Sequence, residues 1–360
     1  MADSAGSGAG AAQAALDAVQ RYPREAIALA QRVLAAGRAV TGDERSTAER
    51  AVGLALRELN DLPGALRHLR RAVRVAVTPR TRALARMSLG YVLANAGRTG
   101  AALRAVTAAL PPLTGADAGR ARMQRGVVLH YRGRYDEAVR DYSLAVEIAQ
   151  REDDPLLEAR ARNNRGLLNA HRGTGRGRAD DLARSAAIFQ RLGLELAAAD
   201  ARWNLGIAAG QRGDTVGALR CFAEVEQEYR RLAVPRPALL LDRFELLLSV
   251  PLLDEAVEVA GAAVRELGRR GMASDLAEAL LAQARAALLA GDLDTATDAA
   301  ARARVRFRRQ GRRTWAAFAR HVELRAELRR GTRSAALLTA LVRTADRLDA
   351  TGWPGPALTT

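Results

Sequence analysis

The stretch most suggestive of chemistry is HRGTGRGRADD at His171–Asp181, in which glycines and arginines alternate. Glycine-rich turns can hold phosphate through backbone N–H groups, and arginine binds phosphate or carboxylate through paired donors. A nucleotide-binding loop of this kind follows a strand and continues into Gly-Lys-Ser/Thr, and the sequence has neither feature. We therefore interpret the stretch as a basic turn between two helices.

The cysteine and the histidines do not predict a reactive centre. Cys221, the single cysteine, stands beside Phe222 on a helix face that we expect to be buried, without a local basic partner that would activate it. We therefore predict a structural thiol. No two histidines are spaced as metal ligands on one helix. The four histidines are His68, His130, His171 and His321.

Two pairs of adjacent carboxylates, Asp153–Asp154 and Asp180–Asp181, stand where we expect helices to begin. At such positions a carboxylate caps the free N–H groups or interacts favourably with the helix dipole. No nucleophile, general base and oxyanion donors fall into a catalytic arrangement. The sequence therefore predicts no enzyme, no cofactor and no metal site within these residues.

The elements that must position these side chains are helices. Hydrophobic residues make up 49% of the chain and aromatic residues only 4%, with alanine and leucine dominant. Alanine and leucine favour helices, and the β-branched and aromatic residues that favour strands are scarce. A chain of 360 residues also exceeds one ordinary core, which indicates several domains or a repeat array.

The charge of the chain is strongly positive, at +16, and every basic residue is arginine because lysine is absent. A strongly basic chain is typical of proteins that bind nucleic acid or an anionic membrane. Lysine-free, arginine- and alanine-rich sequences are typical of GC-rich genomes, so we attribute the excess mainly to codon usage. A selected anionic partner is the alternative. Because arginines occupy predicted turns and outer faces alike, we expect any nucleic-acid binding to be weak and salt-sensitive.

No segment predicts export or a membrane anchor. The N-terminal MADSAGSGAGAAQAA lacks a basic leader and an apolar core, and we interpret residues 1–12 as a disordered tail. Charged residues interrupt every apolar run before it reaches the length of a membrane span. With one cysteine, no internal disulfide is possible. We expect a cytoplasmic protein with no membrane partner.

A repeat of about 36–40 residues organises the chain. Pairs of glycines stand seven residues apart, an alanine follows the second glycine by five residues, and a larger residue follows that alanine by four. Weaker copies without all these glycines extend the pattern toward both ends. The four glycine pairs are Gly90/Gly97, Gly126/Gly133, Gly166/Gly173 and Gly206/Gly213.

Each position of the repeat has a physical reason. The first glycine permits close approach of two antiparallel helices, and the second permits the positive φ that ends a helix. The alanine is again a close-contact position, and we expect the larger residue to fill the gap between neighbouring repeats. Leucine at Gly206 or Ala218 should therefore destabilise the array through overpacking.

The segments Asn204–Phe222 and Arg125–Tyr142 resemble the tetratricopeptide repeat, with a period longer than usual for that family. The resemblance implies an all-α, right-handed superhelical solenoid of about nine helix pairs. We assign residues 13–356 to this array and residues 357–360 to the start of a further repeat in a truncated chain.

In this repeat family the first helix of each pair lines a concave groove, which implies a face that binds a protein or peptide carrying acidic groups. Trp203 is the expected anchor, and Arg120 and Arg160 are expected to hold acidic groups. The implied groove residues are Met87, Tyr91, Arg120, Met123, Val127, His130, Arg160, Asn163, Leu167, Asp200, Trp203 and Ile207.

Two stretches, LGLELAAADARWNLGIAAGQRGD and LDATGWPGPALTT, are similar to the N-terminal arrays of actinobacterial proteins that end in a CHAT domain, a caspase-like protease module. This resemblance implies a non-catalytic recognition arm that controls an attached C-terminal effector. Two alternatives stay open: the repeat portion of a bacterial transcription regulator, and a basic solenoid that binds nucleic acid directly.

Overall fold

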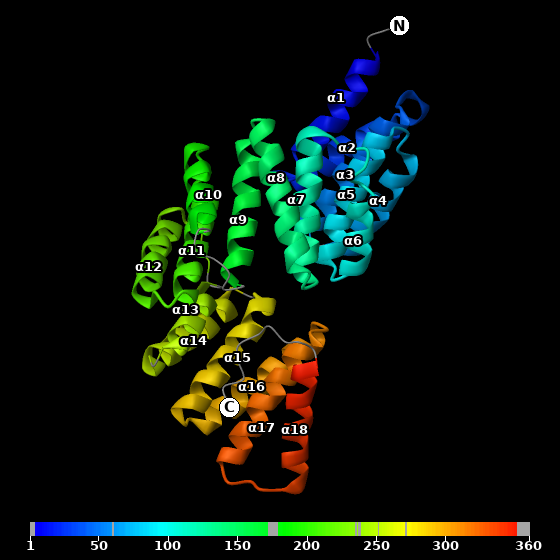
Figure 1. Ribbon diagram of the computed structural model, residues 1–360. Coiled ribbons are helices and arrows are strands. Elements are labelled where there is room, and N and C mark those ends of the chain that lie inside the picture. The colour runs from blue at the N-terminus through cyan, green and yellow to red at the C-terminus, as the bar shows by residue number, and fades with distance from the viewer. Residues whose placement is uncertain are drawn as a thin grey trace. The chain divides into compact units, whose positions relative to one another are not determined.

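The computed structural model describes residues 4–59, 61–171, 179–234, 236, 239–250, 252–270 and 272–350. These residues form eighteen α-helices, one short 3₁₀ helix at Gly37–Ala39 and no strand, which confirms the predicted all-α repeat array of about nine helix pairs (Figure 1). The helices alternate as first and second members of successive pairs, beginning with α1 and α2.

The chain divides into two compact units, and the boundary falls within α11. The N-terminal unit is Met1–Leu205, and the C-terminal unit is Gly206–Thr360. The first eleven helices are α1 Ser4–Asp17, α2 Pro23–Ala35, α3 Gly42–Glu58, α4 Leu62–Val75, α5 Pro79–Asn95, α6 Thr99–Thr107, α7 Gly115–Tyr131, α8 Tyr135–Arg151, α9 Pro155–His171, α10 Ala179–Arg191 and α11 Glu195–Gln211. The others are α12 Thr215–Arg231, α13 Leu239–Ser249, α14 Leu253–Arg269, α15 Ala273–Ala290, α16 Leu293–Arg309, α17 Arg313–Arg329 and α18 Ala335–Ala350.

The first glycine of each repeat lies where the two helices of a pair touch, as the sequence predicts. A Cβ atom placed on Gly126 would lie 2.6 Å from the ring of Tyr142, and one on Gly206 would lie 2.6 Å from the ring of Phe222. The larger residue therefore packs against the glycine of its own pair, whereas the sequence suggested that it fills the space between pairs. Tyr142 and Phe222 are almost fully buried.

The second glycine of each described pair ends a first helix with positive φ. Gly97, Gly133 and Gly213 have φ values of 72°, 72° and 84°, a region that an L side chain rarely adopts. Asp214 then accepts a hydrogen bond from the backbone N–H of Gly217 at 2.8 Å and caps α12. Ala218, the small residue after this turn, is completely buried.

The N-terminus differs from the predicted tail at residues 1–12. Helix α1 begins at Ser4, and Ala12 and Ala15 are buried in a cluster with residues of α2 and α3. Alanine has the highest helix propensity, and its small side chain lets α1 approach its neighbours closely. The absence of large apolar residues in this segment concealed the helix in the sequence.

Two expectations from the sequence fall outside the described residues. The basic turn suggested for GTGRGR lies between the end of α9 at His171 and the start of α10 at Ala179, and residues 172–178 are not described. The further repeat suggested for residues 357–360 is not described either.

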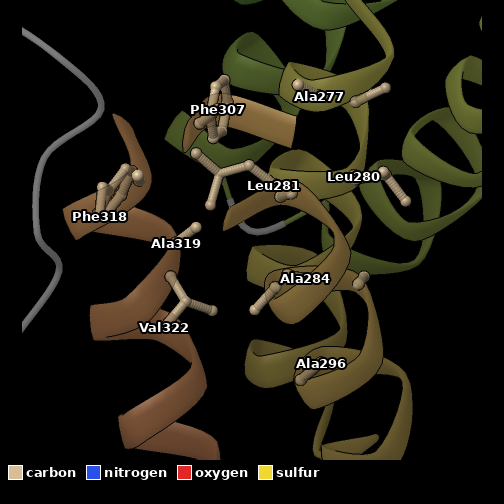
Figure 2. Close-up of a cluster of buried hydrophobic side chains, with 14 of the residues drawn as sticks. Ala277, Leu280, Leu281, Ala284, Ala296, Phe307, Phe318, Ala319 and Val322 are labelled. Carbon is tan, nitrogen blue, oxygen red and sulfur yellow. The ribbon is translucent and has the colours of Figure 1, made fainter. Parts of the chain in front are cut away.

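The core of the C-terminal unit is built largely from alanine and leucine. Ala284 of α15 and Ala319 of α17 are fully buried, and Val322 lies beside them (Figure 2). Phe307 of α16 fills the end of this cluster, and the guanidinium of Arg312 covers its ring at 4.9 Å. Because alanine forms most of the contacts, the helices can pack closely. A small number of large side chains, such as Phe307, then fixes how the helices are aligned.

Buried ion pairs repeat along the N-terminal unit. Asp141 of α8 accepts hydrogen bonds from Arg125 Nε at 2.6 Å and from Arg122 Nη1 at 3.3 Å. Forty residues later the same arrangement joins Asp181 of α10 to Arg165 and Arg162 of α9, at 2.7 and 2.8 Å. Both carboxylates are buried. Each ties a second helix to the first helix of its own pair.

We expect Gly206→Leu to lower the free energy of unfolding by about 1–3 kcal/mol, because the added side chain would meet the ring of Phe222. The control is Gly268→Leu in α14, where an added Cβ meets nothing within 4 Å. Leucine has the higher helix propensity, so the control should be neutral or stabilised by up to about 1 kcal/mol. Equal urea midpoints for the two variants would contradict the close approach at Gly206.

Candidate partner-binding face

The first helices of the N-terminal unit form one layer, because α3, α5, α7 and α9 are successive neighbours. Direct hydrogen bonds join this layer. Gln124 Nε2 of α7 donates to the Met87 carbonyl of α5 at 2.8 Å, and Asn204 Nδ2 of α11 donates to Asn163 Oδ1 of α9 at 3.1 Å. The predicted groove residues on these helices therefore belong to one helical layer.

The predicted groove residues vary in exposure. The exposed residues are Tyr91, Arg120 and Arg160, and the half-buried ones are Met87, Met123, Val127, His130, Asn163, Leu167, Asp200 and Ile207. Ile207 belongs to the C-terminal unit. Several half-buried members are already engaged: Met123 and Val127 pack on the cluster around Tyr142, and the ring of His130 lies 5.9 Å from that of Tyr135.

Trp203 does not have the role that the sequence suggested. Its side chain is only 2% exposed and belongs to the core. A partner could reach its indole only by repacking the helices around it. The position three residues before the first glycine therefore points between helices, and the large apolar side chain of Trp203 is buried for the usual hydrophobic reason.

Arg120 is exposed but is engaged within the chain. Its guanidinium bonds Asp154 at 2.7 Å and Asp117 at 3.3 Å, and Asp117 also pairs with Arg80 at 2.5 Å. Reversing the charge of Arg120 would put three carboxylates together, so we expect the variant to be less stable than the wild type. Arg160, by contrast, has no ion pair within the described part of the chain.

A buried cation stands in the same layer of first helices. Arg50 of α3 is 8% exposed, and its Nε donates to Ser88 Oγ of α5 at 3.2 Å. Burial lowers the pKa of Arg50 to about 10, although the nearby carboxylate of Asp117 opposes the shift. The guanidinium is thus held in the layer without a directly bonded carboxylate in the described residues.

The C-terminal unit has a pocket on the corresponding face, formed by the first helices α13, α15 and α17. Its volume is about 220 Å³. A cavity of about 150 Å³ can hold a benzene ring, so this pocket has room for one large side chain. The lining residues are Glu245, Leu248, Ser249, Arg285, Leu288, Leu289, Phe318, His321, Val322 and Arg325.

The pocket combines an apolar wall with cationic groups. Arg285 forms an ion pair with Glu245, and its guanidinium lies 5.9 Å from the centre of the Phe318 ring. His321 Nδ1 lies 3.2 Å from Thr344 Oγ1, and burial together with Arg325 lowers the pKa of this histidine. The imidazole is therefore neutral at pH 7, and the arginines carry the positive charge of the pocket.

Sequence reasoning missed this pocket. Its residues come from three helices about 40 residues apart, in repeats that lack the glycine pairs. Glu245, Arg285 and Arg325 do recur at 40-residue spacing in the sequence. This recurrence of charged residues at equivalent repeat positions is the feature of the sequence that could have indicated the pocket.

Further features of the described residues concern a metal site, a membrane span and a reactive thiol. No group of three or more histidine, cysteine, aspartate or glutamate side chains there is placed to hold a metal ion. No helix in the same residues is both long enough and apolar enough to span a bilayer. Cys221 is half-buried rather than fully buried, and it occupies the repeat position that Asp141 and Asp181 hold in earlier pairs.

Comparisons with known proteins show the fold. No family model and no curated protein match the sequence. A Rap protein complexed with competence and sporulation factor superposes with a TM-score of 0.59 at 15% identity, over 79% of this chain and 80% of that chain. A tetratricopeptide repeat protein from Parabacteroides merdae gives 0.52 at 16% identity, over 84% and 99%.

A third similar structure is a signal transduction ATPase of the STAND class with a tetratricopeptide repeat sensor, from Pyrococcus horikoshii. It superposes with a TM-score of 0.60 at 11% identity, over 92% of this chain and 53% of that chain. These likenesses show the fold: it is that of the tetratricopeptide-type helical repeat proteins. A resemblance to arrays with a CHAT domain is not among the findings.

Proposed function

We propose that the chain is a non-catalytic scaffold that binds a protein partner through an extended peptide segment on its first helices. The pocket between α13, α15 and α17 is the observation that carries this proposal. Its wall of leucine, valine and phenylalanine suits one large apolar side chain of the peptide. The polar rim then fixes the orientation of the segment.

The proposed peptide carries an acidic group beside its apolar anchor. Arg285 is 14% exposed and Glu245, its partner, is 45% exposed. Arg285 contacts Glu245 through Nη1 alone, so an incoming carboxylate can displace Glu245 into solvent and bind the guanidinium through two of its donors. Arg325 adds a second positive charge at the pocket. This chemistry supports the acidic partner that the resemblance to repeat proteins implied.

The fold likeness supports the same reading. The Rap protein that superposes on this chain is complexed with competence and sporulation factor, so a related helical array holds a partner in that structure. For the N-terminal unit, taken by itself, we propose a second contact surface around Tyr91 and Arg160, which are exposed on α5 and α9. Trp203 is excluded from it because it is buried.

We further propose that partner binding controls an effector attached to the array, such as a CHAT protease domain. Attachment to a bacterial transcription regulator is the alternative. The coding sequence downstream of Thr360 distinguishes the two, because it would encode either a protease module with histidine and cysteine or a helix-turn-helix. Neither arrangement changes the role proposed for the pocket.

The pocket can be tested with peptides selected on the full chain from a displayed random library. Leu289 is 44% exposed at the pocket, so Leu289→Glu should fold normally. Its carboxylate should compete for the arginines and weaken peptide binding at least tenfold, which is about 1.4 kcal/mol. Isothermal titration calorimetry measures the loss.

The matched control is Val305→Glu on α16, a second helix. Val305 is 41% exposed and lies outside the pocket, so this variant adds the same charge without touching the site. Its affinity for the selected peptides should stay within about twofold of wild type. Equal losses in the two variants, with unchanged melting temperatures, would contradict the proposed pocket.

A further inference from the structure

A row of four arginines lies along one face of α4 in the N-terminal unit. Arg67, Arg70, Arg71 and Arg74 are spaced by three, one and three residues, so they follow the same side of the helix. The row spans about 10 Å at 1.5 Å per residue. All four side chains are exposed. This is a dense local positive charge on a second helix, separate from the proposed peptide pocket.

The arginines border a hollow of about 680 Å³, which lies within the range of roughly 300–1,000 Å³ found for small-molecule sites. Val73 of α4 and Leu89 of α5 contribute apolar surface to it, and His68 lies at its edge. The hollow is thus large enough for an organic anion and combines charge with apolar walls.

Most of this charge is not neutralised by the protein. Arg71 Nε lies 3.6 Å from Glu49 Oε1, and the other oxygen of Glu49 accepts from His68 Nδ1 at 2.6 Å. Arg67, Arg70 and Arg74 have no hydrogen-bond or ion-pair partner within the described residues. Elsewhere in this unit several partly buried arginines, such as Arg125 and Arg165, are paired with carboxylates.

We propose that this hollow, the α4 arginine pocket, binds a ligand with a triphosphate or longer polyphosphate group. Four arginines on two turns of one helix, bordering one hollow, call for a ligand that concentrates three or four negative charges. A triphosphate carries that charge over a few ångströms, whereas a peptide supplies at most one carboxylate per residue. The planar guanidinium fork also matches two phosphate oxygens at once.

Two sources provide this chemistry: a nucleoside triphosphate and inorganic polyphosphate. The apolar surface of Val73 and Leu89 could receive a nucleobase, and only the nucleotide would use it. The two are distinguished by comparing ATP with inorganic tripolyphosphate. Tighter binding of ATP assigns the site to a nucleotide, and equal binding assigns it to polyphosphate; both results support the phosphate site.

The test uses the full chain in isothermal titration calorimetry at 150 mM salt, with tripolyphosphate, ATP and a hexaglutamate peptide as probes. We expect one site for tripolyphosphate and a loss of at least tenfold in affinity in the double variant Arg70→Gln, Arg74→Gln. Glutamine keeps the helix propensity of arginine, and both residues are exposed, so α4 should remain folded.

The matched control is the double variant Arg308→Gln, Arg309→Gln, which removes the same charge from two exposed residues of α16. It should retain wild-type affinity for tripolyphosphate. An equal loss in this control would show that overall charge, not the pocket, attracts the anion, and would overturn the proposal. So would the absence of tripolyphosphate binding, or tighter binding of hexaglutamate than of tripolyphosphate.

Discussion

Replacing Asp181 by asparagine should lower the free energy of unfolding by about 3–5 kcal/mol, which makes this the largest single effect that we expect. Asp181 is 5% exposed and accepts hydrogen bonds from Arg162 and from both Nε and Nη2 of Arg165. The amide would leave the guanidinium of Arg165 without a carboxylate and that of Arg162 with only Glu158, at a partly buried site. A urea titration followed by far-UV circular dichroism measures the loss.

The neighbouring residue provides a matched control. Asp180 stands one position earlier in α10, is 56% exposed and pairs with Arg184 at 2.9 Å. Asp180→Asn removes the same charge from the same helix end, yet an exposed ion pair contributes only about 0–1 kcal/mol. If both substitutions shifted the urea midpoint equally, the effect would come from the helix end and not from the buried pair.

The stabilisation by Asp181 should also depend on pH. Burial raises the pKa of this carboxyl, but the hydrogen bonds and charges of Arg165 and Arg162 lower it by more than burial raises it. The pKa therefore lies below the ordinary value of 3.8. The ionised form is favoured by folding, and its contribution is complete above pH 3.8. It is lost as the pH falls through the lowered pKa. The difference between wild type and Asp181→Asn should therefore narrow in acid.

Replacing Arg50 by methionine should raise the free energy of unfolding by about 1–3 kcal/mol. Lowering the pKa of Arg50 from 12.5 to about 10 corresponds to a cost of about 3 kcal/mol for the charged form at pH 7. Methionine keeps the length of the side chain and buries without that cost. The substitution also removes the hydrogen bond that Arg50 donates to Ser88 Oγ, and this loss offsets part of the stabilisation.

The control for Arg50 is Arg308→Met on α16, where the arginine is exposed and its loss should change the unfolding free energy by less than about 0.5 kcal/mol. Thermal melts of the two variants would give the comparison. A melting temperature for Arg50→Met at or below that of wild type would show that the guanidinium is fully compensated in the fold.

The repeat and its helices could be predicted from the sequence because each position has a steric meaning. Gly126 and Gly206 stand where an added Cβ would strike an aromatic ring, and Gly133 and Gly213 have positive φ. These constraints act within one pair and leave a fixed spacing in the chain. The first turns of helix α1 could not be predicted because residues 4–12 contain no large apolar side chain, and Ala12 is the residue of this stretch that is buried in the cluster.

The functional face was harder to predict because neighbouring positions on a helix differ by 100° in direction. The repeat frame predicts that Trp203 faces a groove, but Trp203 is buried. It predicts that Arg120 holds acidic groups of a partner, but Arg120 pairs with Asp117 and Asp154 of its own chain. The pocket of the C-terminal unit depends on which side chains of α13, α15 and α17 meet after stacking. Spacing along the chain does not give that orientation.

The measurement that tests the central claim most directly is photocrosslinking of a selected peptide to the full chain. A photoreactive phenylalanine analogue replaces the apolar anchor of the peptide, and mass spectrometry locates the adducts. The proposed scaffold predicts adducts on α13, α15 and α17, at pocket residues such as Leu248 and Leu289. Adducts confined to the second helices α14 and α16 would contradict partner binding by the first helices.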